Sequence, residues 1–341
     1  MTNYTLGYDT WVIEDNIREM FVTITCCIIN ASIAFFGIIF NTFNVVVFIK
    51  MGFQETTNIS LLGLTISDLG CLLTLEWIYL CFNPLFSNAG LPFVAFEIEY
   101  ITGGWPHVCF ARITAFITAF VTFERCLCIV KPLEVKRILT PARTFYIIVS
   151  IYVLMFVSVS PAFGVNLLQW KFYSSENKTR IGIVYTENRN EVERVLFATN
   201  NSCGYIAFLM VSLFTAVLIS RLKIKGRWRQ ESVAVDLAGS VLSRDRKVMK
   251  MVLTISAVFI VFSFPITIVF IGTMAYPQFG TGGKYANLFY MCAQSAYFME
   301  IINSSVNFFI YYTMSAKFRK TISGWYRDIV KFKKRYWLLI Y

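Results

Sequence analysis

The sequence is poor in charged residues and almost without histidine. Only 15% of the 341 residues are charged, whereas 57% are hydrophobic. Soluble domains are about 25% charged and about 45–50% apolar, so this chain lacks the polar residues that a water-facing surface needs. A single histidine, His107, and the lack of a metal-type cysteine spacing exclude a histidine-rich metal centre. These shortages indicate a protein that crosses a membrane several times.

The positive charge of the chain does not indicate nucleic-acid binding. The formal net charge is +11, but the basic residues lie between long apolar runs. An aromatic content of 17% and the lack of low-complexity stretches exclude a disordered chain. Nine cysteines, most of them inside apolar runs, do not form the framework of a small disulfide-rich protein. We therefore expect membrane lipids, and no nucleic acid, as partners of the chain.

Seven segments are long and apolar enough to cross a bilayer, which takes about 20 residues each. They predict an all-α membrane protein, a bundle of seven transmembrane helices. Residues 22–312 would form this membrane domain, with an extracellular tail at 1–21 and a cytoplasmic tail at 313–341. The predicted spans are residues 22–49, 59–82, 98–130, 143–168, 196–220, 247–275 and 285–312.

Lysine and arginine gather in the segments after the first, third, fifth and seventh predicted spans. Cytoplasmic loops carry an excess of these residues, so the distribution predicts an N-terminus outside and a C-terminus inside. Two sequons for N-linked glycosylation, at Asn3 and Asn177, fall on the outer side in that orientation. We expect a multi-pass glycoprotein of the plasma membrane.

Several predicted spans contain polar residues at membrane depth, where an unpaired polar group is costly. Asn303 and Asn307 are four residues apart and share one helix face. Asn41 and Asp68 lie at the middle of the first and second spans. One cluster shared by several helices explains all four residues. Hydrogen bonding between helices is the alternative for the asparagines, but a lone carboxylate must be neutralised by a proton or a cation.

Motifs on four of the spans resemble those of rhodopsin-like G-protein-coupled receptors. The second span contains Leu64–Asp68, with the family's Leu-x-x-x-Asp, and the third ends in Glu124–Leu133, with its Glu-Arg and Pro-Leu. The seventh span contains Asn303–Tyr311, similar to Asn-Ser-x-x-Asn-Pro-x-x-Tyr. The sixth span contains Phe259 and Pro265, which match the family's Phe and Pro. The motifs occur in the family's order and at its spacing.

Within that family, the residue pattern at 103–110 and 131–136 is similar to that of molluscan chemosensory receptors. Phe318 and Arg319 stand where the family has a short amphipathic eighth helix. The resemblance implies a receptor that passes an extracellular signal, a small molecule or a peptide, to a heterotrimeric G protein. It implies neither an enzymatic activity nor a resident cofactor.

The sequence departs from the family pattern at several positions. Phe308 replaces the proline of the seventh-span motif, and Ser263 replaces the tryptophan before the proline of the sixth span. Tyr100 stands where the family has the cysteine of its outer disulfide. We therefore do not expect that disulfide in this chain.

The resemblance assigns roles to individual residues near the cytoplasmic side. Glu124 would hold Arg125 in the inactive state; on activation Arg125 would be released toward the G protein and Tyr311 would swing inward. A mere ion pair at a helix end is the alternative for Glu124 and Arg125. The implied activation set is Glu124, Arg125, Phe259, Pro265, Asn307 and Tyr311.

The resemblance also implies an allosteric sodium site. Its positions supply oxygen atoms and one carboxylate, which suit a hard cation; a hydrated polar network without an ion is the alternative. The positions are Asp68, Thr114, Asn303, Ser304 and Asn307.

The ligand pocket is expected in the outer half of the bundle. Amine receptors of the family carry Asp where this chain has His107, so a standard biogenic amine is not expected. Glu300 either meets a cation or bonds to a neighbouring helix, and Arg112 is a further charge with an open role, for which Glu76 is one conceivable partner. The candidates for the pocket are His107, Ala111, Ile266, Phe270, Tyr297 and Glu300.

Other classes of protein remain as alternatives. A receptor for a neuropeptide or small-molecule transmitter is one alternative, and the loop at residues 169–195 is long and charged enough to meet a peptide. A transporter would show repeated halves with broken helices, and the sequence has no internal repeat. An intramembrane enzyme would need a nucleophile with a base or a set of metal ligands, and neither spacing is present.

Overall fold

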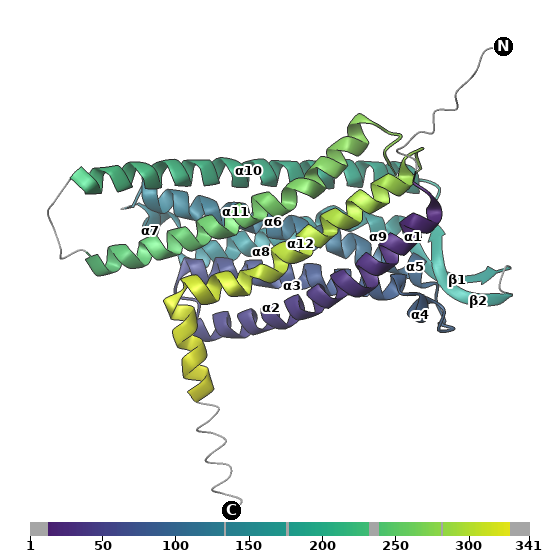
Figure 1. Ribbon diagram of the computed structural model, residues 1–341, viewed down its shortest axis with the longest axis horizontal. Coiled ribbons are helices and arrows are strands. Elements are labelled where there is room, and N and C mark those ends of the chain that lie inside the picture. Colours follow the sequence, from purple (N-terminus) through teal and green to yellow (C-terminus); the bar gives the residue numbers. More distant parts are fainter. Residues whose placement is uncertain (1–12, 133, 175–176, 232–238, 281, 328–341) are drawn as a thin grey trace, which may run out of the picture.

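The computed structural model describes residues 13–327 except 133, 175–176, 232–238 and 281. The glycosylation sequon at Asn3 and the tail from residue 328 lie outside the described residues. Long helices run side by side and form one elongated bundle (Figure 1). They are α1 (Asp15–Ile24), continued through a π-helical turn (Thr25–Asn30) into α2 (Ala31–Met51), α3 (Thr56–Phe82), α6 (Trp105–Val130), α8 (Pro141–Val159), α10 (Arg189–Glu231), α11 (Gly239–Ala275) and α12 (Ala286–Met314).

These helices follow the predicted spans. In the described part of the chain, six helical stretches are long and apolar enough to cross a membrane: 15–51, 56–82, 95–130, 141–165, 189–223 and 247–275. The seventh predicted span corresponds to the helix α12. This helix is long enough to cross a membrane, but the polar residues from Asn303 to Asn307 make it less apolar than the other six. The first helix begins at Asp15, seven residues before the predicted start of the first span at residue 22.

The helix α6 lies at the centre of the bundle. It packs against α3, α8, α10 and α11, and its Trp105, Ile113 and Ile117 are fully buried. By contrast, α8 turns large apolar side chains such as Leu154 and Val157 outward, where each is about three-fifths exposed (62% and 61%). Buried polar residues inside and apolar residues outside suit a bundle whose surroundings are lipid.

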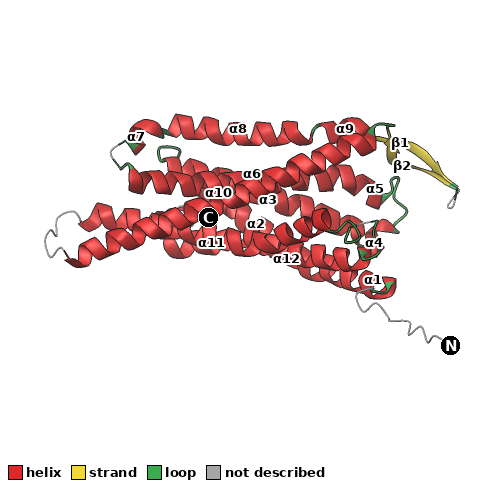
Figure 2. Cartoon of the chain, turned by 90° about the horizontal axis from the view of Figure 1, so that it is seen from above, coloured by secondary structure: helices red, strands yellow, loops and turns green. Residues whose placement is uncertain are grey.

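The prediction of an all-α chain is wrong for one segment. Residues after the fourth helical stretch form an antiparallel hairpin of β1 (Asn166–Tyr173) and β2 (Lys178–Tyr185), which projects from one end of the bundle (Figure 2). The fourth span therefore ends with α9 (Pro161–Val165), before the predicted residue 168. Along residues 168–172, leucine, tryptophan and phenylalanine alternate with glutamine and lysine, a pattern typical of a strand.

The hairpin is attached to the segment that precedes α6. The backbone N–H of Ile181 donates to the carbonyl of Pro92 at 2.8 Å, and the N–H of Val94 donates back to Ile181 at 3.0 Å. The Glu97 carboxylate of α5 (Ala95–Glu99) accepts from the N–H of Ile183 at 2.7 Å. The nine cysteines all lie in the described part of the chain and form no disulfide. These hydrogen bonds therefore connect the hairpin to the entrance of α6 without a disulfide.

The opposite end of the bundle carries α7 (Val135–Ile138) and a further helical segment at residues 316–327. This segment follows a break at Ser315, whose hydroxyl accepts from the N–H of Phe318 at 3.2 Å. It turns sharply away from the direction of α12 (Figure 1). Phe318 is fully buried and its ring meets those of Phe48 and Tyr311. Burial of Phe318 fixes the segment against the bundle.

Candidate functional site

A polar cluster lies around Asp68, in the middle of the bundle. The Asp68 carboxylate is fully buried. One of its oxygens accepts from Thr114 Oγ1 at 3.1 Å and the other accepts from Asn307 Nδ2 at 2.7 Å. Thr114 Oγ1 also lies 2.9 Å from the hydroxyl of Ser67. The carboxylate thus joins α3, α6 and α12, as the sequence predicted for a shared cluster.

The first helix joins the same cluster through Asn41. Its Nδ2 donates to the backbone carbonyl of Ser304 at 2.8 Å and to that of Gly37 at 2.9 Å. Ser304 and Asn303 are both buried. The predicted sodium positions Asp68, Thr114, Asn303, Ser304 and Asn307 are therefore all buried side chains on three adjacent helices, α3, α6 and α12.

The Glu124–Arg125 pair lies at the end of α6 that is opposite the hairpin. The carboxylate of Glu124 is 1% exposed and accepts from Arg125 Nη2 at 2.6 Å. It also accepts from the hydroxyls of Thr56 and Ser60, while Arg125 Nη2 donates to the hydroxyl of Thr57 at 2.8 Å. The first turns of α3 thus hold both members of the pair. Sequence reasoning missed these hydroxyls, because no pattern within the sequence shows that α3 begins beside the end of α6.

A further contact joins α6 to α11 near this pair. The hydroxyls of Thr122 and Ser256 lie 2.6 Å apart and are buried. One helical turn away, Phe259 is buried in a cluster with Ala115 and Val211, between α6, α10 and α11. Pro265 lies inside α11, where it removes one helical hydrogen bond and favours a bend. Of the sixth-span residues of the predicted activation set, Phe259 therefore lies in the interior contact of α11, whereas Pro265 is partly buried within the helix.

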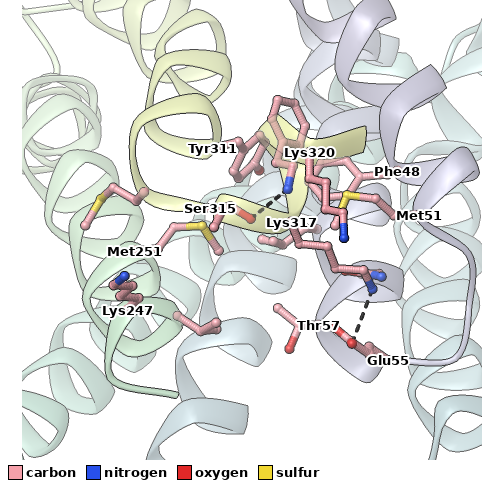
Figure 3. Close-up of a pocket in the computed structure, with 16 residues that line it drawn as sticks. Phe48, Met51, Glu55, Thr57, Lys247, Met251, Tyr311, Ser315, Lys317 and Lys320 are labelled. Carbon is pink, nitrogen blue, oxygen red and sulfur yellow. Dashed lines mark hydrogen bonds and ion pairs between the residues drawn. The ribbon is translucent and has the colours of Figure 1, made fainter. Parts of the chain in front are cut away.

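A cavity of about 490 Å³ opens beside the Glu124–Arg125 pair. It lies between the ends of α2, α3, α11 and α12, and the start of the 316–327 segment closes one side (Figure 3). Tyr311 and Met251 line its wall, and Lys247 and Lys320 bring ammonium groups to it. Thr57, which accepts the hydrogen bond from Arg125, is part of the same wall. The cavity is mainly apolar, and its edge carries Lys247 and Lys320 together with the ion pair of Lys317 and Glu55 at 3.2 Å.

Tyr311 connects the cavity with the polar cluster. It is fully buried, its ring meets Phe48 and Phe318, and in the described part of the chain its hydroxyl has no hydrogen-bond partner. It follows Asn307 by one helical turn on α12. Tyr311 therefore lies between the cavity and the asparagine that donates to Asp68.

The candidates for the ligand pocket are only partly brought together. Nε2 of His107 lies 3.6 Å from the Glu300 carboxylate, and the rings of His107 and Tyr297 meet edge to face with centroids 5.7 Å apart. These three residues form one cluster between α6 and α12. Ala111, Ile266 and Phe270 are partly buried on α6 and α11, and nothing places them in direct contact with that cluster. No ion pair joins Arg112 to Glu76 among the described residues.

The fold and the buried polar residues define a multi-helix membrane bundle with an interior polar site and an apolar cavity at one end. The family model described as 7 transmembrane receptor (rhodopsin family) matches residues 41–311 of the chain. Since the match covers most of the sequence, the chain belongs to this family, and it is a class A G-protein-coupled receptor by family, not a member of an enzyme family. None of the curated proteins matches the chain.

Proposed function

We propose that this receptor activates a heterotrimeric G protein when an extracellular ligand binds at the hairpin end of the bundle. The observation that carries the proposal is the pair of Glu124 and Arg125 next to the cavity that Tyr311 lines. An apolar cavity with lysines at its edge suits a helical partner segment that carries apolar side chains and a negative charge. The carboxyl-terminal tail of a G-protein α subunit has this chemistry.

In the inactive state Arg125 is held by Glu124 and by the hydroxyl of Thr57. Arginine is costly at a membrane boundary unless it is paired, so opening of the cavity requires a new partner for it. A G protein supplies carbonyl and carboxylate oxygens for this purpose. Ligand binding shifts the balance between the two states by as much as its affinities for them differ.

The orientation of the chain follows from the same proposal. The cavity end faces the cytoplasm and the hairpin end faces outward, so that the N-terminus and Asn177 are extracellular and the protein lies in the plasma membrane. The segment at 316–327 acts as the eighth helix along the inner leaflet. Lys317 pairs with the Glu55 carboxylate at 3.2 Å, so Lys320 is the lysine of this segment that we expect to meet anionic lipid. Phe318 anchors the segment in the bundle.

A sodium ion suits the polar cluster around Asp68. The carboxylate, together with the hydroxyl of Thr114 and amide oxygens of α12, supplies hard oxygen donors on three helices. The two hydrogen bonds that the carboxylate accepts leave lone pairs on both oxygens. Bound there, a cation would neutralise the buried charge and favour the closed arrangement of α3, α6 and α12.

For the ligand, we favour a chemosensory role, on the residue pattern at 103–110 and 131–136, which resembles that of molluscan chemosensory receptors. A neuropeptide or transmitter receptor is the second candidate. Trp170 and Phe172 of the hairpin are 65% and 60% exposed, and exposed aromatic side chains on an outer strand suit a peptide that adds contacts along it. No feature of the described residues favours a transporter.

A ligand library tests the proposal in cells that express the receptor with a promiscuous G protein. We expect a subset of ligands to raise second-messenger levels in the wild type and not in Arg125→Ala at matched surface expression. A response of Arg125→Ala equal to that of the wild type would contradict the proposed mechanism. Lys131→Ala, which removes an exposed ion pair at the same end of α6, is the control and keeps the response.

A further inference from the structure

Arg112 lies in the contact between α6 and α10. Its guanidinium packs against Gly204: a Cβ at Gly204 would lie 2.1 Å from Nη1 and 2.7 Å from Cζ of Arg112. Further along the same contact, Ala115 and Ala119 of α6 meet Ala207 of α10. Arg112 therefore points into the helix contact and not into lipid, and the missing side chain of Gly204 makes the room for it.

Arg112 forms no ion pair within the described part of the chain. The side chain is partly buried, and its Nε is fully buried without a hydrogen-bond partner. Arginine remains protonated in proteins, so loss of a proton does not remove this charge. A buried cation without an anion destabilises the fold.

The nearby carboxylates are engaged with other groups. Glu300 lies within electrostatic reach of Arg112, but it pairs with His107 at 3.6 Å. Glu193, near the start of α10, accepts from Tyr100 at 2.9 Å and pairs with Arg189 at 3.2 Å. The fork of N–H groups on Arg112 is thus left for a partner that the described chain does not supply.

We propose that the ligand of this receptor carries a carboxylate and that Arg112 binds it. The inference rests on the proposed receptor function and adds the chemical class of its ligand. The planar guanidinium donates two parallel hydrogen bonds to a carboxylate, which is its best geometric match. A protonated amine in the same place would be repelled by the positive charge of Arg112.

Two sources of carboxylate are compatible with this site, a water-soluble acid from outside and a long-chain fatty acid from the bilayer. The test therefore uses the full-length receptor in lipid nanodiscs with both kinds of probe. One arm is a panel of soluble aliphatic and aromatic monocarboxylic acids, and the other is a series of long-chain fatty acids. Each acid is compared with its methyl ester and with the corresponding primary amine.

The readout is the midpoint of thermal unfolding, which a bound ligand raises. We expect members of one acid series to raise it, and their esters and amines to leave it unchanged. Arg112→Met is expected to weaken acid binding by about 10- to 100-fold, because a charge-assisted hydrogen-bond pair is lost. Arg112→Lys keeps the charge but not the forked pair of N–H groups, so its affinity for the acid is expected to lie between those of the wild type and Arg112→Met.

Two further measurements separate a ligand site from a structural role. Without any probe, Arg112→Met is expected to unfold at the same temperature as the wild type or a higher one, because it removes an unpaired charge. Gly204→Ala displaces the guanidinium at constant charge and is expected to lose the acid effect. Gly164→Ala, whose added Cβ meets nothing within 4 Å, is the control and keeps it.

Three results would overturn the proposal: no acid of either series raises the midpoint, esters or amines raise it as much as acids, or Arg112→Met keeps the full acid effect. A lower midpoint of Arg112→Met without probe would assign a structural role to Arg112. Acid binding without nucleotide exchange on any G protein would refute the proposed function and leave the ligand class standing. Nucleotide exchange that is driven by a ligand without a carboxylate, and that is unchanged in Arg112→Met, would refute the ligand class and leave the proposed function standing.

Discussion

Removing the charge of Glu124 is expected to activate the receptor without a ligand. Glu124→Gln keeps the size of the side chain and one carbonyl oxygen, but it replaces the carboxylate that Arg125 Nη2 contacts at 2.6 Å. If that contact exists only in the closed state, the substitution destabilises this state relative to the open one. The open state then becomes more populated at equilibrium.

The size of the effect follows from the bonds that Glu124 accepts. Hydrogen bonds to a charged group contribute about 1.5–3 kcal/mol, and neutral ones about 0.5–1.5 kcal/mol. Replacing a charged acceptor by a neutral one beside Arg125 therefore costs about 1–2 kcal/mol, and the weaker bonds from Thr56 and Ser60 add to this. Since about 1.4 kcal/mol is tenfold in an equilibrium constant, the open-to-closed ratio rises by about 10- to 100-fold.

The assay is basal guanine-nucleotide exchange in membranes, normalised to receptor at the cell surface. Glu134→Gln is the matched control, because Glu134 forms a 3.2 Å pair with Lys131 at the same end of α6 with both side chains about half exposed (46% and 52%). An exposed pair contributes at most about 1 kcal/mol, so basal exchange stays near that of the wild type. Equal basal exchange in Glu124→Gln and Glu134→Gln at normal expression would refute the assigned role of the pair.

Three other outcomes are expected. Sodium should lower agonist affinity in the wild type and have no effect in Asp68→Asn, and radioligand competition at several sodium concentrations measures this; a parent receptor insensitive to sodium would exclude the ion. Gly37→Ala places a Cβ 2.2 Å from Ser305 Oγ and 2.9 Å from Leu72 Cδ1, so overpacking between the first helix, α3 and α12 should cost about 1–3 kcal/mol, seen as a lower unfolding temperature in nanodiscs. Asn177→Gln should remove one glycosidase-sensitive shift in electrophoretic mobility, since Asn177 is exposed beside the hairpin turn; no glycan on Asn177 would count against an extracellular hairpin.

The helical framework could be predicted from the sequence because an apolar run long enough to cross a bilayer has few alternatives to a helix. The cluster around Asp68 could also be predicted in outline, since Asn303 and Asn307 must share a helix face and a buried carboxylate needs partners. The bonds of Asp68 to Thr114 and Asn307 agree with that prediction.

Other features depend on contacts that no local pattern records. The hydroxyls of Thr56 and Thr57 meet the Glu124–Arg125 pair only because α3 begins beside the end of α6. The hairpin at 166–185 was missed because its charged residues indicated a loop, although the alternation of apolar and polar residues along 168–172 is typical of a strand. The charge of Arg112 was visible in the sequence, but the space that Gly204 leaves for it was not, because that space belongs to a second helix.

The central claim is tested most directly by the rate of GDP release from purified heterotrimeric G proteins with the receptor in nanodiscs. We predict that Glu124→Gln accelerates release from at least one G-protein class above the empty-nanodisc rate, and that adding Arg125→Ala to the same chain returns release to that rate. Release at the empty-nanodisc rate with Glu124→Gln for every G-protein class, or acceleration that persists after Arg125→Ala, would contradict the account.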